Sequence, residues 1–142
     1  MIYTEMTKKA IKLVIEKHKD QVDKAGLPYY LHPIHVAESM DDEISCTCAL
    51  LHDVIEDTSM TLEDLKEKGF SDEVLDVLSL LTHDDDVPYM EYIEKIKTNP
   101  IATKVKLSDL AHNMDLSRID NVTDEDLDRI EKYKKAKELL IK

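Results

Sequence analysis

The sequence predicts an all-α protein, folded as a compact bundle of roughly seven or eight helices. Residues that break helices are scarce, because the 142 residues include only 2 Gly and 4 Pro. Aromatic residues that favour strands are also few, with 1 Phe and no Trp beside many Leu, Ile, Lys and Glu. No segment alternates apolar and polar residues as a half-buried strand would. No internal repeat or low-complexity linker divides the chain, so we expect a single domain over residues 1–142.

Four helices are expected in the first half of the chain, where apolar residues recur at three- and four-residue steps. They run over residues 4–19, 33–40, 43–56 and 61–69. Gly26 and Pro28 place a loop between the first two helices. Pro33 suits the first turn of the second helix, because its missing N–H needs no partner there. The third helix, Glu43–Glu56, is apolar over a wide stripe, which predicts a central helix buried on most sides.

Four further helices are expected in the second half. They run over residues 71–81, 89–97, 99–116 and 123–142. Ser71 and Thr123 are residue types that cap a helix N-terminus. Asn99 followed by Pro100 is a strong start signal, a cap and then a proline in the first turn. The last helix is amphipathic and is expected to pack on the bundle or on a second subunit. A homodimer is therefore one of two alternatives.

The charge of the chain excludes several classes of partner. It carries 19 basic and 31 acidic side chains, a formal net charge of -12 at pH 7. This excess repels nucleic acid backbones and anionic membranes, so we expect neither as a partner. No run approaches the roughly 18 apolar residues of a membrane span, and residues 1–9 lack the apolar core of a signal peptide. We interpret Cys46 and Cys48 as buried thiols in a reducing compartment and expect a cytoplasmic protein.

Residues that bind metals or activate water gather near the end of the central helix. They are His52, Asp53, Glu56 and Asp57. At about 100° per residue, these four fall within a sector of about 140° on one helix. No lysine or arginine lies within residues 43–60 to balance the acids. Acids on an otherwise apolar helix repel one another unless a cation joins them, so the pattern favours a metal site over a solvated acidic face.

Two other segments carry residues of the same kinds. Asp109 lies in the helix expected over residues 99–116, with His112 and Asn113 on the same face one turn later. His32 stands just before the second helix. A mixed set of histidines and aspartates suits Mn, Fe, Co, Ni or Zn better than Ca. We therefore expect one divalent metal as the cofactor.

These residues stand in local motifs that resemble a known family. The motifs are LHP at residues 31–33, LLHDVIEDT at 50–58 and KLSDLAHNMD at 106–115. They resemble the HD-domain phosphohydrolases, and more narrowly the hydrolase half of the bacterial alarmone enzymes and their small stand-alone relatives. Those enzymes remove the 3′-diphosphate from guanosine tetraphosphate. The resemblance covers about Met6 to Arg118. The order of the motifs is more specific than the pair His52–Asp53 alone, which we call the HD pair.

The resemblance implies an HD-domain bundle, a nucleotide substrate and a set of metal ligands. The implied ligands of one metal, usually Mn²⁺ in that family, are His32, His52, Asp53 and Asp109. A cation held there would lower the pKa of a water molecule and offset charge on a phosphoryl oxygen.

Further roles concern water and substrate. The resemblance implies that Glu56 and Asp57 hold and activate the attacking water, and Glu56 follows the histidine of the HD pair by one helical turn, within reach of that water. It also implies that Lys24 and Asn113 contact the nucleotide. Lys106 and Arg118 are interpreted as further contacts to its phosphates. These roles together imply a metal-dependent hydrolase of a nucleotide phosphoester or diphosphate, with alarmone-like 3′-diphosphates as first candidate substrates.

The chain departs from the family at positions that usually carry basic residues. Asp23, Leu110 and Asp115 stand there instead. An arginine that stacks on a base or pairs with a phosphate is not replaced by aspartate, so recognition of the base and phosphates is altered. A second reading is therefore a 5′-nucleotide or deoxynucleotide phosphatase of the wider HD group. A third is a non-catalytic module that senses nucleotides, although the retained Glu56 and Asp57 count against it.

Overall fold

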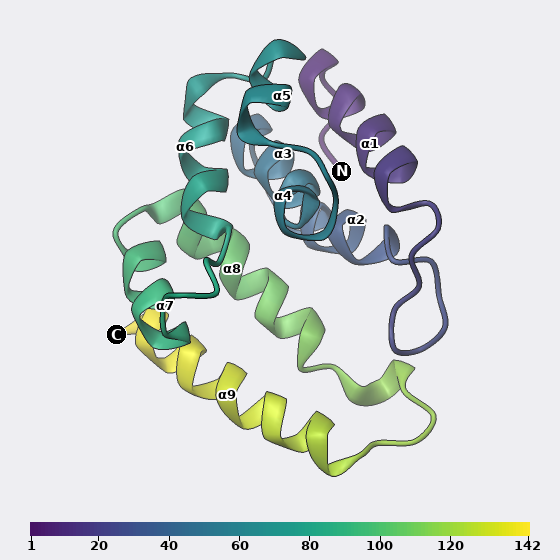
Figure 1. Ribbon diagram of the computed structural model, residues 1–142, viewed down its shortest axis with the longest axis vertical. Coiled ribbons are helices and arrows are strands. Elements are labelled where there is room, and N and C mark those ends of the chain that lie inside the picture. The colour runs from purple at the N-terminus through teal and green to yellow at the C-terminus, as the bar shows by residue number, and fades with distance from the viewer.

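Helices make up the architecture of residues 1–142, all of which the computed structural model describes, and the all-α class is confirmed. No strand forms; Val22 and Pro28 make only an isolated antiparallel bridge. The α-helices are α1 (Glu5–His18), α2 (Leu31–Glu38), α3 (Glu43–Leu51), α4 (Val54–Asp57), α5 (Leu62–Glu67), α6 (Asp72–Leu81), α7 (Tyr89–Lys97), α8 (Pro100–Asn113) and α9 (Asp124–Ile141). A short 3₁₀ helix, η1 (Leu116–Arg118), separates α8 from α9 (Figure 1).

Side-chain caps fix most of the helix starts where the sequence places them. Thr4, Thr61 and Thr123 form capping boxes at α1, α5 and α9, in which each side chain bonds a backbone N–H of the first turn. Ser71 caps α6 in the same way through the backbone N–H of Val74. Asn99 accepts from two backbone N–H groups at the start of α8, just before Pro100. The predicted starts of these helices are therefore confirmed to within a residue or two.

The central helix is divided, which the prediction of a continuous Glu43–Glu56 helix missed. Helix α3 ends at Leu51, and the single turn of α4 begins at Val54. Between them Asp53 has φ -103° and ψ -2°, in the sparsely populated bridge region where many active-site residues sit. The Nδ1 atom of His52 bonds the carbonyl oxygen of Ala49 at 2.6 Å, so a side chain takes up a carbonyl of the last helical turn. The HD pair thus lies on a turn and not along a helix face.

Two other helix ends differ from the prediction. Helix α2 begins at Leu31, so His32 lies within its first turn and not before it. Backbone bonds from Leu31 to Pro28 and from His32 to Tyr29 wind the loop directly into the helix. Helix α8 ends at Asn113, because the side chain of Asp115 accepts from the Ser117 N–H and caps η1 instead.

Helix α3 lies at the centre of the bundle. Every residue from Ser45 to Leu51 is buried, and α1, α2, α6 and α8 contact this helix. The 27 buried apolar residues form one continuous cluster that includes Ala10 of α1 and Leu140 of α9. Helix α9 packs on α7 and α8. None of the helices has both the length and the apolar character needed to cross a bilayer.

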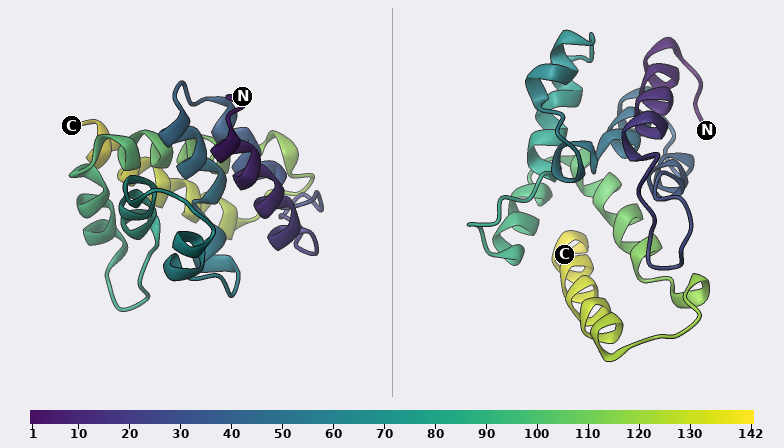
Figure 2. Two further views of the ribbon diagram at one scale, coloured as in Figure 1. Left: turned by 90° about the horizontal axis from the view of Figure 1, so that it is seen from above. Right: turned by 45° about the vertical axis from the view of Figure 1, so that its right-hand side comes forward.

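One end of the molecule brings together segments that are distant in the chain. The loop between α1 and α2, the end of α8 with η1, and the start of α9 all lie there (Figures 1 and 2). These segments line a common cavity, so the connections and not the helix bodies shape the region beside the site.

Candidate metal centre and adjoining cavity

The structure brings together all four residues that the sequence predicts as metal ligands. This His–Asp cluster consists of His32, His52, Asp53 and Asp109. The Oδ1 atom of Asp109 lies 2.8 Å from Nε2 of His32 and 3.3 Å from Nε2 of His52. The Oδ2 atom of Asp53 lies 3.0 Å from Nε2 of His52 and 3.8 Å from Nε2 of His32. Ligand atoms of His32, His52 and Asp109 all lie within 4.8 Å of one another, and the carboxylate of Asp53 adjoins this group on the side of His52.

The protonation of His52 indicates what the space between these ligand atoms accommodates. Its Nδ1 atom bonds the Ala49 carbonyl, which only accepts, so Nδ1 carries the proton. In the neutral ring, Nε2 then presents a lone pair to the carboxylates. That Nε2 atom is buried and has no hydrogen-bond partner. A lone pair facing two carboxylate oxygens is satisfied when a cation lies between them, so the donor set fits a divalent metal.

The charges of the cluster shift the pKa values of its own members. Burial lowers the pKa of His52, but the carboxylates of Asp53 and Asp109 raise it well above its ordinary value. Burial raises the pKa of Asp109, but Lys106 and His52 lower it well below the usual range. Without a metal, the protein therefore compensates for its buried acids with protonated bases.

Helix α8 also supplies groups that hold Asp109. Lys106 places Nζ 3.0 Å from Oδ2 of Asp109 and is itself largely buried. Asn113 donates from Nδ2 to Oδ1 at 3.0 Å. The sequence predicts both residues as substrate contacts, and the structure places both against Asp109. On the other side of the cluster, Nδ1 of His32 shares a hydrogen bond of 2.7 Å with Nδ1 of His112.

Tyr29 is a residue of the site that the sequence analysis missed. Its hydroxyl donates to Oδ2 of Asp53 at 2.5 Å. Burial and the neighbouring Asp53 raise the pKa of Tyr29 above its usual range, so the hydroxyl stays protonated. A tyrosine in a loop carries no signal of its own. Its position three residues before His32 is the only indication in the sequence.

Glu56 and Asp57 lie on α4, directly after the HD pair, and keep solvent access. The Oε1 atom of Glu56 accepts a hydrogen bond from the backbone N–H of His83. Partial burial raises the pKa of both carboxyls, and the charge of Asp53 adds to this effect. The divided helix thus places two acids with raised pKa values beside the His–Asp cluster.

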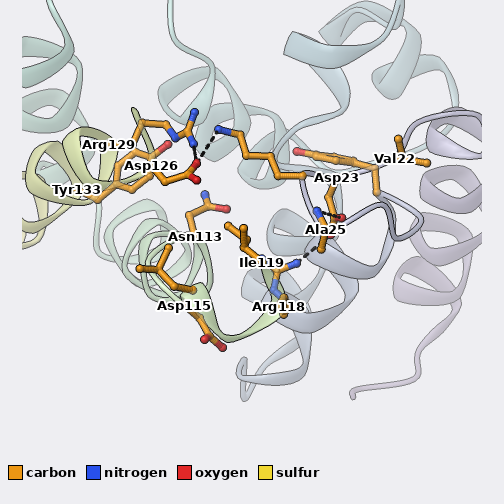
Figure 3. Close-up of a pocket in the computed structure, with 13 residues that line it drawn as sticks. Val22, Asp23, Ala25, Asn113, Asp115, Arg118, Ile119, Asp126, Arg129 and Tyr133 are labelled. Carbon is orange, nitrogen blue, oxygen red and sulfur yellow. Dashed lines mark hydrogen bonds and ion pairs between the residues drawn. The ribbon is translucent and has the colours of Figure 1, made fainter. Parts of the chain in front are cut away.

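A cavity of about 420 Å³ lies next to the cluster. Figure 3 shows the residues that line it. They are Val22, Asp23, Lys24, Ala25, Tyr29, Asn113, Asp115, Leu116, Arg118, Ile119, Asp126, Arg129 and Tyr133. Two of these reach the cluster directly, because Tyr29 bonds Asp53 and Asn113 bonds Asp109. The cavity therefore opens beside the cluster.

The predicted substrate contacts divide between the cavity and the cluster. Lys24, Asn113 and Arg118 line the cavity, whereas Lys106 does not. Helix α9 contributes Arg129 and Tyr133, which the sequence analysis did not single out. An amphipathic pattern shows that a helix packs, but not which site its face completes.

Comparison with known proteins finds guanosine-3′,5′-bis(diphosphate) 3′-pyrophosphohydrolases and GTP pyrophosphokinases among the relatives. No family model matches the chain. The guanosine-3′,5′-bis(diphosphate) 3′-pyrophosphohydrolase of Aquifex aeolicus is 34% identical over 97% of this chain, which spans only 20% of that relative. The human guanosine-3′,5′-bis(diphosphate) 3′-pyrophosphohydrolase MESH1 is 35% identical, and the match covers 77% of this chain and 68% of that protein.

A solved structure matches almost the whole fold. It is described as a metazoan ortholog of SpoT that hydrolyses ppGpp and plays a role in starvation responses. The TM-score is 0.80 at 27% sequence identity, covering 99% of this chain and 88% of the other. The helical bundle is that of an HD-domain protein. The chain belongs to the guanosine-3′,5′-bis(diphosphate) 3′-pyrophosphohydrolase family of RelA/SpoT-type hydrolases.

Proposed function

We propose that this chain is a metal-dependent phosphohydrolase that releases pyrophosphate from nucleoside 3′-diphosphates, with guanosine-3′,5′-bis(diphosphate) as the first candidate. The observation that carries the proposal is the His–Asp cluster beside a cavity of about 420 Å³. That volume is in the usual range for sites that bind small molecules. We assign the activity to residues 1–142 as one domain, since a single apolar core includes residues from α1 to α9.

The cofactor in this proposal is one divalent metal held by the His–Asp cluster, with Mn²⁺ first and Fe, Co, Ni or Zn as alternatives. A cation there supplies a water molecule of lowered pKa and offsets the charge that develops on the phosphoryl oxygens. Asn113 and Lys106 hold the two oxygens of Asp109, and Tyr29 holds Oδ2 of Asp53. These bonds fix the carboxylates before substrate arrives.

Glu56 acts as the general base and Asp57 orients the attacking water. Glu56 removes a proton as the water oxygen bonds to phosphorus. The bond from phosphorus to the 3′ oxygen breaks, and the 3′ oxygen leaves as a hydroxyl by taking the proton that Glu56 received from the water. The raised pKa of Glu56 suits this role, since a base works best with a pKa near the operating pH.

The remaining part of the nucleotide lies in the cavity. Lys24, Asn113 and Arg118 line the cavity, and we assign them contacts to the sugar and the 5′ end of the nucleotide there. Lys106 serves Asp109 in place of the substrate contact that the sequence suggests, because its ammonium group is buried against that carboxylate.

The test is incubation of the Mn²⁺-loaded protein with a nucleotide panel, read by mass spectrometry. The panel contains guanosine-3′,5′-bis(diphosphate), its adenosine analogue, 3′- and 5′-nucleotides and deoxynucleoside triphosphates. We expect release of pyrophosphate from the 3′-diphosphates, lost with chelator and restored by Mn²⁺. Turnover of 5′-nucleotides alone would favour the wider group of HD phosphatases. Tight binding without any turnover would favour a nucleotide-sensing module.

A further inference from the structure

The cavity wall carries as many carboxylates as cations. The cations are those of Lys24, Arg118 and Arg129, and the carboxylates are those of Asp23, Asp115 and Asp126. Each cation pairs with an acid of the same wall. Arg118 donates to Oδ2 of Asp23 at 2.8 Å. Arg129 donates to Oδ1 of Asp126, and Nζ of Lys24 lies 3.7 Å from the same oxygen (Figure 3).

Asp23 is fixed in place by the backbone. Its Oδ1 accepts from the N–H groups of Ala25 and Leu27 at 2.9 and 3.0 Å, which leaves Oδ2 for Arg118. The side chain is only 14% exposed. The carboxylate therefore cannot turn toward solvent without breaking two backbone hydrogen bonds in the loop between α1 and α2.

Asp126 is fixed in the same manner at the start of α9. Its Oδ2 accepts from the N–H of Thr123 at 2.9 Å as part of the capping box, so Oδ1 remains directed at Arg129 and Lys24. The side chain is 9% exposed. Both acids are thus held in the wall, Asp23 against Arg118 and Asp126 against Arg129, whereas Lys24 is 55% exposed and pairs only loosely with Asp126.

This arrangement acts against a substrate that brings many charges into the cavity. A second diphosphate on the nucleotide would reach Arg118 beside Asp23, which holds one Nη of that guanidinium while the buried Nε has no partner. The phosphate and the poorly solvated Asp23 carboxylate would then share one cation, and the repulsion between the two anions is costly. The net charge of -12 adds repulsion at longer range. A 5′-hydroxyl, in contrast, donates a hydrogen bond and requires no free cation.

We propose that Asp23 and Asp126 are specificity-determining residues that make the site prefer nucleoside 3′-diphosphates with an uncharged 5′ end over those with a 5′-diphosphate. This inference rests on the proposed function, because it assigns the 3′-diphosphate to the His–Asp cluster and the 5′ end to the cavity. The selectivity comes from acids of the wall and not from a lack of basic residues.

The test compares guanosine 3′-diphosphate with guanosine-3′,5′-bis(diphosphate) as substrates of the Mn²⁺-loaded protein. The measured quantity is the ratio of their kcat/KM values, at low and at physiological salt. We expect the wild-type ratio to favour the 5′-hydroxyl substrate by about tenfold at low salt and by less at physiological salt, because salt screens the repulsion. The Asp23→Asn variant should bring the ratio down about tenfold, since it removes one negative charge beside Arg118.

Each variant keeps the shape of the side chain and removes one negative charge. Asparagine keeps an oxygen for the N–H groups of Ala25 and Leu27, and circular dichroism checks that the loop change leaves the fold intact. Asp126→Asn is the second variant and should lower the ratio in the same direction. Asp76→Asn on the exposed face of α6 makes the same charge change away from the cavity and should leave the ratio unaltered.

The possible results distinguish a failure of the specificity inference from a failure of the proposed function. Hydrolysis of both substrates with a wild-type preference for the 5′-diphosphate would overturn the specificity inference and leave the proposed function intact. A ratio that is the same in wild type and both variants would also overturn it. Hydrolysis of neither substrate would reject the proposed function, and the inference with it.

Discussion

The buried ion pair between Lys106 and Asp109 gives a prediction with a calculable size. Lys106→Met keeps the long apolar stem but removes the ammonium group that lies 3.0 Å from Asp109. The two side chains are 13% and 6% exposed, so water screens the pair poorly. Removal of one partner from a buried pair leaves an uncompensated charge and costs about 3 to 5 kcal/mol. We use the lower limit, because His32, His52 and Asn113 still contact Asp109.

The loss of stability in Lys106→Met should be large without metal and small with metal bound. About 3 kcal/mol, with an unfolding entropy of about 0.3 kcal/mol/K for 142 residues, lowers Tm by about 10 °C in the metal-free protein. A divalent cation beside Asp109 replaces the lost positive charge, so the loaded protein should lose only about 1 kcal/mol. The difference of about 2 kcal/mol requires the variant to bind metal about 30-fold more tightly.

The assay is thermal unfolding with chelator and with saturating Mn²⁺, together with calorimetric titration of the metal. Lys104→Met is the control on the same helix, because Lys104 pairs with Asp41 at the surface and its removal should change stability by less than about 1 kcal/mol. Equal losses of Tm with and without metal would refute the reasoning, because Lys106 would then act only by packing. Weaker metal binding in Lys106→Met would refute it as well.

Four other predictions concern the site and the buried thiols. Tyr29→Phe removes the hydroxyl that holds a cluster carboxylate, so the Kd for Mn²⁺ should rise about tenfold in a calorimetric titration. Glu56→Gln removes the proposed base, and kcat should fall by about 10² to 10⁴-fold while the Kd for Mn²⁺ changes little. Cys46 and Cys48 should not react with a thiol reagent until the protein is denatured, because burial raises the pKa of both thiols. Since the folded pKa of Cys48 lies above its ordinary 9.0, its contribution to stability is complete below that pH and should decline as pH rises further.

Each of these results has a matched control. Tyr30→Phe removes a hydroxyl with no side-chain hydrogen bond in the cluster and should leave metal affinity unaltered; an equal effect would show that the Tyr29 bond is irrelevant. A Glu56→Gln protein with wild-type kcat would remove Glu56 from the mechanism. Rapid labelling of either thiol in the folded protein would contradict the buried position of Cys46 and Cys48. A Cys48→Ala protein that declines equally at alkaline pH would show that another group is responsible.

Local signals in the sequence located the helices. Thr4, Ser71 and Thr123 cap helices wherever they occur before an apolar periodic segment, because the capping bond involves only the next three residues. No such signal marks the break at His52 and Asp53, because the apolar residues on both sides keep helical spacing. At the break, Nδ1 of His52 bonds the carbonyl oxygen of Ala49.

Some residues of the site were indicated by the sequence and others were not. His52 and Asp53 stood out because histidines and acids without balancing lysines are costly in an apolar segment unless a cation joins them. His32 and Asp109 were added to them by the resemblance to the HD-domain phosphohydrolases. Tyr29 and the α9 residues Arg129 and Tyr133 were not predictable. Their residue types are common on surfaces, and they join the site only because a loop and a distant helix meet beside α8. Lys106 lies 3.0 Å from Asp109, and its place three residues before Asp109 in the sequence does not distinguish a contact to substrate from a contact to that carboxylate.

The most direct test of the metal centre is a comparison of wild type with Asp53→Ala, using two readouts on the same samples. After loading with Mn²⁺ and dialysis, the metal content is measured by mass spectrometry, and pyrophosphate release from guanosine-3′,5′-bis(diphosphate) is then followed. Asp41→Ala, an exposed acid on the surface, is the control. We predict about one metal ion per chain and chelator-sensitive release for wild type and control, with neither for Asp53→Ala. An Asp53→Ala protein that hydrolyses the substrate without bound metal would contradict the account.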